Sequence, residues 1–182
     1  VTEVHEIPFL PIQFFKSHPI VLQNHTPQIT FTSSGTSGPH TSQHPVPFVS
    51  IYEKSFTQAF NHFFPNHTQQ VIIGLLPSYM ERKGSSLIYM VENLIQQNTT
   101  NKCIMEINLS QSTLQILQNP AIPKILIGVT FALLNLAEKG VKLANTKVIE
   151  TGGMKGMRKE IVREELHEIL QKGLGIKEIY SE

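Results

Sequence analysis

Short apolar runs alternate with helix-forming patterns along most of this 182-residue chain. The runs Val71 to Leu76 and Lys124 to Val129 are rich in aliphatic residues and each lies beside a proline, which is typical of buried strands. Between them, apolar residues recur at helical spacing over Ser85 to Gln97 and Ser110 to Gln118. Strands that alternate with helices in this way predict an α/β fold with a largely parallel sheet and flanking helices.

The same patterns predict the remaining elements. Further strands are expected at Gln28 to Thr32, Cys103 to Ile107, Lys147 to Glu150 and after Lys177, and a further helix over Thr130 to Lys139. A helix over Ser50 to Phe64 should bury one apolar face, made of Ile51, Phe56, Ala59, Phe60, Phe63 and Phe64. A helix over Arg158 to Gln171, ended by Gly173, should bury Ile161, Val162, Leu166, Ile169 and Leu170.

The overall charge is low, since 15 Lys and Arg residues face 14 Asp and Glu residues, for a net charge of +1. The basic residues are scattered rather than gathered on one stripe, so binding to nucleic acid or to an anionic membrane surface is not expected. The longest apolar stretch, Ile125 to Ala137, is shorter than the roughly 20 residues that a membrane span needs. Cys103 is the only cysteine and can form no internal disulfide, which is typical of cytoplasmic proteins.

Residues 1–27 form a proline-rich lead segment. Its prolines limit helix length and favour extended turns; they are Pro8, Pro11, Pro19 and Pro27. Residues 7–15 are nevertheless largely apolar. We therefore expect the lead segment to pack on the core formed by residues 28–182, or on a bound apolar ligand.

The expected strand at Gln28 to Thr32 leads into a loop of hydroxyls and glycines. Glycine permits positive φ and a close approach of the backbone to a ligand. Backbone N–H groups and hydroxyls held together form a concave array of donors that suits phosphate oxygens, at about 1.5–3 kcal/mol for each charge-assisted bond. The candidate phosphate ligands are Ser33, Ser34, Gly35, Thr36, Ser37 and Gly38. A flexible Ser/Gly linker is the alternative, and the lack of a following Gly-Lys-Ser/Thr excludes a Walker-type loop.

Two other loops follow expected strands, at residues 77–84 and 151–156. In open parallel sheets, ligands bind beyond the carboxyl ends of the strands, where such loops converge. The second loop begins Thr151-Gly152-Gly153, and its double glycine permits close approach to a flat ring, with Lys155 and Arg158 nearby for anions. Taken alone, the first loop could equally be a strand–turn–helix joint, and the second a surface turn that starts an amphipathic helix.

Three of these segments together resemble a known family. The Ser-Ser-Gly-Thr-Ser-Gly run at 33–38 is similar to the phosphate-binding signature of adenylate-forming enzymes, the ANL superfamily. The Ile-Pro-Phe-Leu-Pro-Ile-Gln-Phe-Phe-Lys string at 7–16 resembles the segment before that signature in LuxE-type acyl-protein synthetases. The string Thr-Gly-Gly-Met-Lys-Gly-Met-Arg at 151–158, with Arg163 to Leu166 downstream, resembles their adenylate-binding segment. The lysine that usually follows the phosphate signature is missing here, and His40 and His44 are candidate donors in its place.

The resemblance implies an activity and its partners. ATP and Mg²⁺ would activate a carboxylic acid, expected to be a fatty acid, as an acyl-adenylate that is then transferred to a thiol of a protein cysteine or of coenzyme A. Ser33 to Gly38 would bind the phosphates and Gly152, Gly153 and Met154 the adenylate, with Lys155 and Arg158 as weaker candidates. It also implies that residues 28–182 are the N-terminal part of an incomplete adenylation domain. An aryl- or acyl-CoA ligase similar to phenylacetate-CoA ligase, and a non-catalytic nucleotide- or acyl-binding fragment, remain alternatives.

Overall fold

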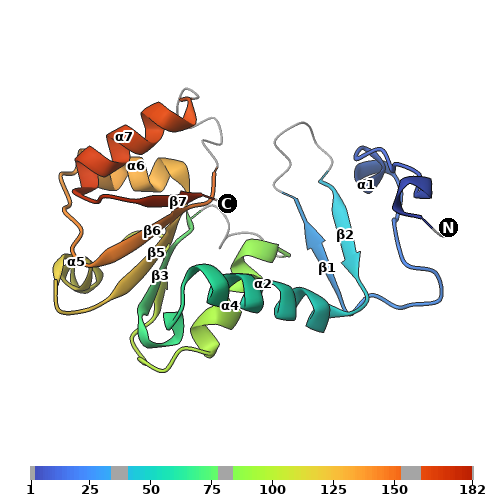
Figure 1. Ribbon diagram of the computed structural model, residues 1–182, viewed down its shortest axis with the longest axis horizontal. Coiled ribbons are helices and arrows are strands. Elements are labelled where there is room, and N and C mark those ends of the chain that lie inside the picture. Colours follow the sequence, from blue (N-terminus) through green and yellow to red (C-terminus); the bar gives the residue numbers. More distant parts are fainter. Residues whose placement is uncertain (1–2, 34–40, 78–83, 153–160, 182) are drawn as a thin grey trace.

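A computed structural model describes residues 3–33, 41–77, 84–152 and 161–181 (Figure 1). Five parallel strands form the main sheet in the order β4-β3-β5-β6-β7, which confirms the expected α/β fold with a largely parallel sheet. The strands are β3 (Val71–Leu75), β4 (Ile104–Glu106), β5 (Lys124–Gly128), β6 (Thr146–Glu150) and β7 (Ile179–Ser181).

Helices connect these strands at nearly the expected positions. They are α2 (Val49–Phe63), α4 (Ser86–Gln96), α5 (Gln111–Gln118), α6 (Thr130–Glu138) and α7 (Arg163–Leu174). Ser85 and Ser110 cap α4 and α5, because each hydroxyl accepts a hydrogen bond from the backbone N–H three residues later. No helix in the described part of the chain is both long and apolar enough to cross a membrane.

The order of the strands sets which face each helix covers. From β3 the chain moves to β4 on one side, and through β5, β6 and β7 on the other. Because crossovers between parallel strands are right-handed, α4 must lie on one face of the sheet and α6 and α7 on the opposite face. Figure 1 shows this arrangement, with α2 on the same side as α4. The direction of the crossovers thus reverses between β3 and β5.

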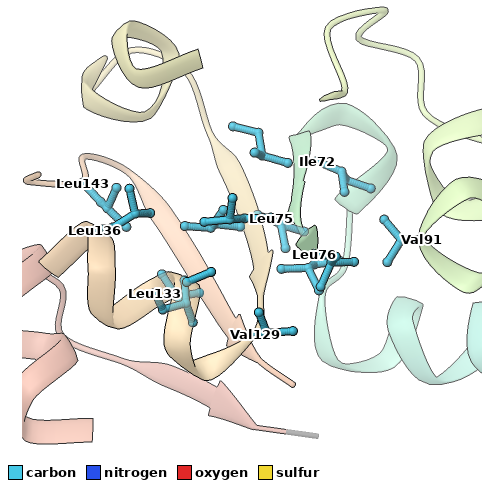
Figure 2. Close-up of a cluster of buried hydrophobic side chains, with 14 of the residues drawn as sticks. Ile72, Leu75, Leu76, Val91, Val129, Leu133, Leu136 and Leu143 are labelled. Carbon is cyan, nitrogen blue, oxygen red and sulfur yellow. The ribbon is translucent and has the colours of Figure 1, made fainter. Parts of the chain in front are cut away.

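Both central strands are buried on both faces. Gly74 of β3 faces α4, since a Cβ there would lie 3.4 Å from Val91, and Gly128 of β5 faces α6, since a Cβ there would lie 2.7 Å from Leu133. Figure 2 shows aliphatic side chains filling the space on either side of β3, among them Val91 on one side and Leu133 on the other. Such strands are typical of parallel sheets covered by helices on both faces.

Helix α2 buries a narrower face than expected. Phe56 and Phe60 are buried, as is Phe64 just beyond the helix, and these residues follow a four-residue spacing along one stripe. Ile51 and Phe63 are 66% and 65% exposed and Ala59 is exposed as well, so the expected burial of these three residues is wrong. The first turns of α2 extend beyond the sheet toward the β1–β2 ribbon, so the sheet does not cover the start of the helix (Figure 1).

Helix α7 differs from the expectation at both ends. Ile161 and Val162 precede the helix, and Val162 and Ile169 are 66% and 38% exposed, so the expected burial of these two residues is wrong. The helix runs through Gly173 and ends at Leu174, and Gly175, with φ of 72°, forms the left-handed cap. Gly173 has another role, because a Cβ at this position would lie only 2.5 Å from the Cβ of Ala137 in α6. It therefore permits the close packing of α6 and α7.

A separate antiparallel ribbon pairs β1 (Ile29–Thr32) with β2 (Gln43–Val46). β1 was expected, whereas β2 was not, because Pro45 lacks the N–H that a strand normally uses for pairing. The lead segment carries the short helix α1 (Phe14–Ser17) and lies beside β2, where the ring of Phe15 stacks on that of His44.

The described contact of the lead segment is with the ribbon, and its packing on the rest of residues 28–182 stays a prediction. Within its described residues, no side chain belongs to the hydrophobic core, and Phe9 and Ile12 are 101% and 75% exposed. The segment lies on the far side of the ribbon from the sheet (Figure 1), which is why these side chains cannot reach the core. Its alternative role, packing on a bound apolar ligand, stays a prediction.

His67 is the least satisfied buried residue in the described part of the chain. It lies in a 3-10 turn, His67–Gln69, and both nitrogens of its imidazole are buried without a hydrogen-bond partner. The ring of Phe60 packs edge-on against it with centroids 5.0 Å apart. Burial lowers the pKa of His67 below its usual 6.5 because the charged imidazolium would lose its hydration.

The first prediction concerns the contact between α6 and α7. Gly173→Ala should reduce the free energy of unfolding by about 1–3 kcal/mol through overpacking, although alanine favours helices. Adding Ala137→Gly should recover much of that loss, because it removes the Cβ that the new methyl group meets. Urea unfolding of the two single variants and the double variant measures this. A Gly173→Ala protein as stable as the parent would contradict the close contact.

The second prediction concerns pH. The unfolded chain protonates His67 near pH 6.5, whereas the folded protein does so only at lower pH, so His67 makes stability fall as the pH drops below about 6.5. His67→Leu should remove this part of the pH dependence and leave stability near pH 8 almost unchanged, since no hydrogen bond of the ring is lost. Urea unfolding between pH 5 and 8 measures it, with exposed His62→Leu as the control that should retain the parent slope.

Candidate functional site

The candidate site lies at the carboxyl edge of the main sheet. Because all five strands are parallel, their carboxyl ends share one edge, and the end of β7 shows in Figure 1 that this edge faces the β1–β2 ribbon. The reversal of crossover direction between β3 and β5 is a topological switch point, where open α/β sheets usually bind ligands. The three loops singled out in the sequence follow β1, β3 and β6.

Main-chain hydrogen bonds join the ends of three strands into one rim. Val129 N, after β5, donates to Leu75 O of β3 over 3.3 Å. Thr151 N, after β6, donates to Gly128 O of β5 over 3.1 Å, and Thr130 N at the start of α6 donates to Gly152 O over 3.3 Å. The Thr151-Gly152 segment is thereby fixed to β5 and to the first residue of α6.

The end of β1 lies against the end of the second loop. Thr32 N donates to Gly84 O over 2.8 Å, and a Cβ on Gly84 would lie 3.1 Å from Thr32 Oγ1. Gly84 also has φ of 83°, a conformation that other residues rarely adopt. The end of β1 and the last residue of the 77–84 loop are therefore in direct contact.

Aromatic packing fixes the ribbon to the helices below it. The buried ring of Phe31 in β1 meets Tyr52 of α2 and Tyr89 of α4, with centroid separations of 5.3 and 5.5 Å. Tyr52 donates its hydroxyl hydrogen to Ser86 O over 3.1 Å. Tyr89 donates to the carboxylate of Glu53 over 2.6 Å, and this hydrogen bond raises the pKa of Tyr89.

Ser33 closes the base of the predicted phosphate loop. Ser33 N donates to Ser42 O and Ser42 N donates to Ser33 Oγ, both over 3.0 Å. Among the described residues, the Ser33 hydroxyl takes part in one side-chain hydrogen bond, as the acceptor from Ser42 N. His44 hydrogen-bonds to Ser42 Oγ through Nε2 over 2.9 Å and stacks on Phe15, so its imidazole is held on the ribbon.

A buried carboxylate supports the loop after β6. Glu150 is 5% exposed, and its Oε1 accepts hydrogen bonds from Thr130 Oγ1 and, over 2.6 Å, from Gly152 N. No lysine or arginine in the described part of the chain pairs with it. Gly152 has φ of 73° with open space where a Cβ would stand, so glycine is required there by the backbone turn.

Of the predicted site residues, the structure describes Ser33, at the end of β1 in the ribbon, and Gly152, in the rim after β6. The others fall outside the described residues: Ser34, Gly35, Thr36, Ser37, Gly38, Gly153, Met154, Lys155 and Arg158. Within the described ranges, no group of three or more His, Cys, Asp or Glu side chains could hold a metal ion. Cys103 is half-buried and accepts a hydrogen bond from Ile72 N over 3.2 Å at the amino end of β4.

An apolar pocket of about 300 Å³ lies between α2 and the sheet, on the face opposite α6. Ile127 and Ile149, neighbours in the register of β5 and β6, form its floor. Its other wall consists of Ala59 and four phenylalanines of residues 56–64, with Met90 of α4 beside them. Thr151 is both a lining residue and part of the rim, so the pocket adjoins the predicted adenylate-binding segment.

The pocket was not predicted from the sequence. The four phenylalanines of residues 56–64 are predicted to face the core, and this explains why Phe56 and Phe60 are buried. The exposed Phe63, which also lines the pocket, shows that the helix carries more aromatic surface than the sheet covers. In the sequence, the one indication of a pocket is that the helix carries aromatic residues outside its buried stripe.

The third prediction tests the support of the rim by Glu150. Thr130→Val removes one of the two donors to the carboxylate and should lower the free energy of unfolding by about 1–3 kcal/mol, whereas Thr130→Ser, which keeps the hydroxyl, should cost much less. The Gly152 amide should exchange with solvent faster in Glu150→Ala than in the parent, because its acceptor is lost. Equal stability of the Val and Ser variants would contradict this role.

Scans of protein-family models, curated proteins and solved structures found no match for this chain. The fold stands on the structure itself. The resemblance to adenylate-forming enzymes rests on the sequence motifs, and the function that follows from it is a proposal.

Proposed function

We propose that this chain takes part in the ATP-dependent activation of a carboxylic acid, preferably a fatty acid, as an acyl-adenylate for transfer to a thiol. The acyl-protein synthetases are the nearest analogy. The observation that carries the proposal is that Thr151 belongs both to the rim, beside Gly152, and to the wall of an apolar pocket. A site for the nucleotide and a site for a hydrocarbon chain would then meet at one residue.

The carboxylate of Glu150 at the rim is engaged by two hydrogen bonds, from Thr130 Oγ1 and Gly152 N. Ser33 to Gly38 would bind the ATP phosphates through hydroxyl and backbone donors, and Gly152, Gly153 and Met154 would contact the adenylate, with Lys155 and Arg158 as weaker candidates. Mg²⁺ is usually held by phosphate oxygens and few protein ligands. When bound, it would neutralise part of the phosphate charge.

In the proposed reaction a carboxylate oxygen of the acid attacks the α-phosphorus of ATP. The bond from the α-phosphorus to the bridging oxygen breaks, and that oxygen leaves with pyrophosphate. The contribution of the chain is to hold both reactants in line and to stabilise charge with fixed donors. Main-chain hydrogen bonds fix Thr151 and Gly152, where the proposed adenylate-binding segment begins, to β5 and to the first residue of α6.

The acyl group would then pass to a thiol of a protein cysteine or of coenzyme A. Cys103 is a poor acceptor, because it lies at the amino end of β4 and the rim lies at the carboxyl ends of the parallel strands. Its sulfur is also engaged by Ile72 N. Cys103, the one cysteine of this sequence, is therefore not the proposed thiol acceptor.

The fourth prediction tests the activity. The chain should catalyse exchange of labelled pyrophosphate into ATP only when a carboxylic acid is present. Thr36→Val should weaken ATP binding by about 10- to 100-fold, as expected for one lost hydrogen bond to a charged group. Thr99→Val is the matched control, since Thr99 bonds only to Thr68 O on a loop at the other end of α4 and should leave both binding and exchange unchanged.

The outcomes separate the candidate functions. If ATP binding depends on Thr36 but no acid supports pyrophosphate exchange, the chain is a nucleotide-binding module and not an acid-activating enzyme. Exchange supported by aryl acids and coenzyme A in preference to fatty acids would favour the ligase alternative. An unchanged ATP affinity in Thr36→Val would exclude the predicted phosphate loop.

A further inference from the structure

We infer that Ala59 sets the length of acyl chain that the pocket accepts, and that the acid has a non-polar far end and about twelve carbons. This inference rests on the proposed function, because it takes the pocket as the site of the acyl chain. It concerns a single position of α2, to which neither the motifs nor the family resemblance assigns a role.

The lining of the pocket determines the chemical class of its ligand. Within the described residues, no charged side chain lines it, and Thr151 at the rim is the one lining residue with a polar side-chain atom. Burying a charged or hydroxylated chain end there would leave that group without a partner, at a large cost in free energy. The head group of an acid must therefore lie at Thr151, and the far end of its chain must be hydrocarbon.

The volume of the pocket limits the length of the chain. An apolar cavity of about 150 Å³ holds benzene, which has six carbons. The pocket measures about 300 Å³, which by the same ratio corresponds to about twelve carbons. Each methylene that enters the pocket should raise affinity about fourfold, and each one beyond its end should add little.

The position of Ala59 makes it the control point for that length. Phe56 and Phe60 are buried against the sheet side of the pocket, whereas Ala59 and Phe63, one helical turn apart, form its exposed wall. Ala59 is the one small side chain in a wall that otherwise consists of phenylalanines. The space above its methyl group is therefore the part of the pocket that a larger side chain would remove.

The fifth prediction uses binding without ATP. The full 182-residue chain is titrated with saturated straight-chain acids of about 6 to 16 carbons, below their micelle concentrations, by calorimetry. Affinity should rise about fourfold per methylene up to about twelve carbons and then level off. Decanedioic acid should bind at least 100-fold more weakly than decanoic acid, because its second carboxylate would enter the apolar end of the pocket.

Ala59→Leu adds three carbons to the wall and should move the plateau to chains about three carbons shorter. Leucine favours helices and position 59 is exposed, so the variant should fold. Gln58→Leu is the matched control, since it adds the same side chain to the neighbouring exposed position outside the pocket and should leave the plateau in place. An unchanged plateau in Ala59→Leu, or no binding of any of these acids by the folded chain, would overturn the inference.

Failure of this inference differs from failure of the proposed function. If acid binding depends on chain length and responds to Ala59→Leu, but no pyrophosphate exchange occurs, the pocket is the acyl-chain site and the proposed enzyme activity is wrong. Exchange whose acid preference is the same in the parent and in Ala59→Leu supports the enzyme and places the acyl chain outside this pocket.

Discussion

Close packing at two glycines of adjacent strands holds the centre of this structure together. A Cβ at Gly74 of β3 would lie 3.1 Å from the Met105 side chain of β4, and a Cβ at Gly128 of β5 would lie 2.7 Å from Leu133 of α6, which leaves no room for a larger residue there. The contact at Gly128 fixes α6 directly over the carboxyl end of β5, and its first residue therefore meets the turn after β6. The rim of the candidate site is a consequence of how tightly the helices lie on the sheet.

The main sheet could be predicted from the sequence because its strands are continuous apolar runs, as strands buried on both faces must be. The ends of the elements were harder to predict. Glycine is typical of a helix end, but Gly173 lies inside α7. Glycine is needed at this position because a larger residue would collide with Ala137. Strand β2 escaped prediction because Pro45 removes a backbone donor, a loss that an edge strand tolerates.

The candidate site was only partly predictable. Ser33 and Gly152 were identified from hydroxyls and glycines that follow expected strands, and the structure places Ser33 at the end of β1 and Gly152 in the rim after β6. Glu150 accepts hydrogen bonds from both Gly152 N and Thr130 Oγ1. Thr130 is 20 residues away in the sequence, so a local sequence pattern cannot predict this hydrogen bond. The pocket depends on the distance between α2 and the sheet, which periodicity along one helix cannot specify.

Helix α2 contacts both the β1–β2 ribbon and the apolar pocket. Its first turns carry Tyr52, on which the ring of Phe31 from the ribbon rests, and its last turns carry the phenylalanines that wall the pocket. A ligand that fills the pocket would therefore rest against the same helix that supports β1 through Tyr52.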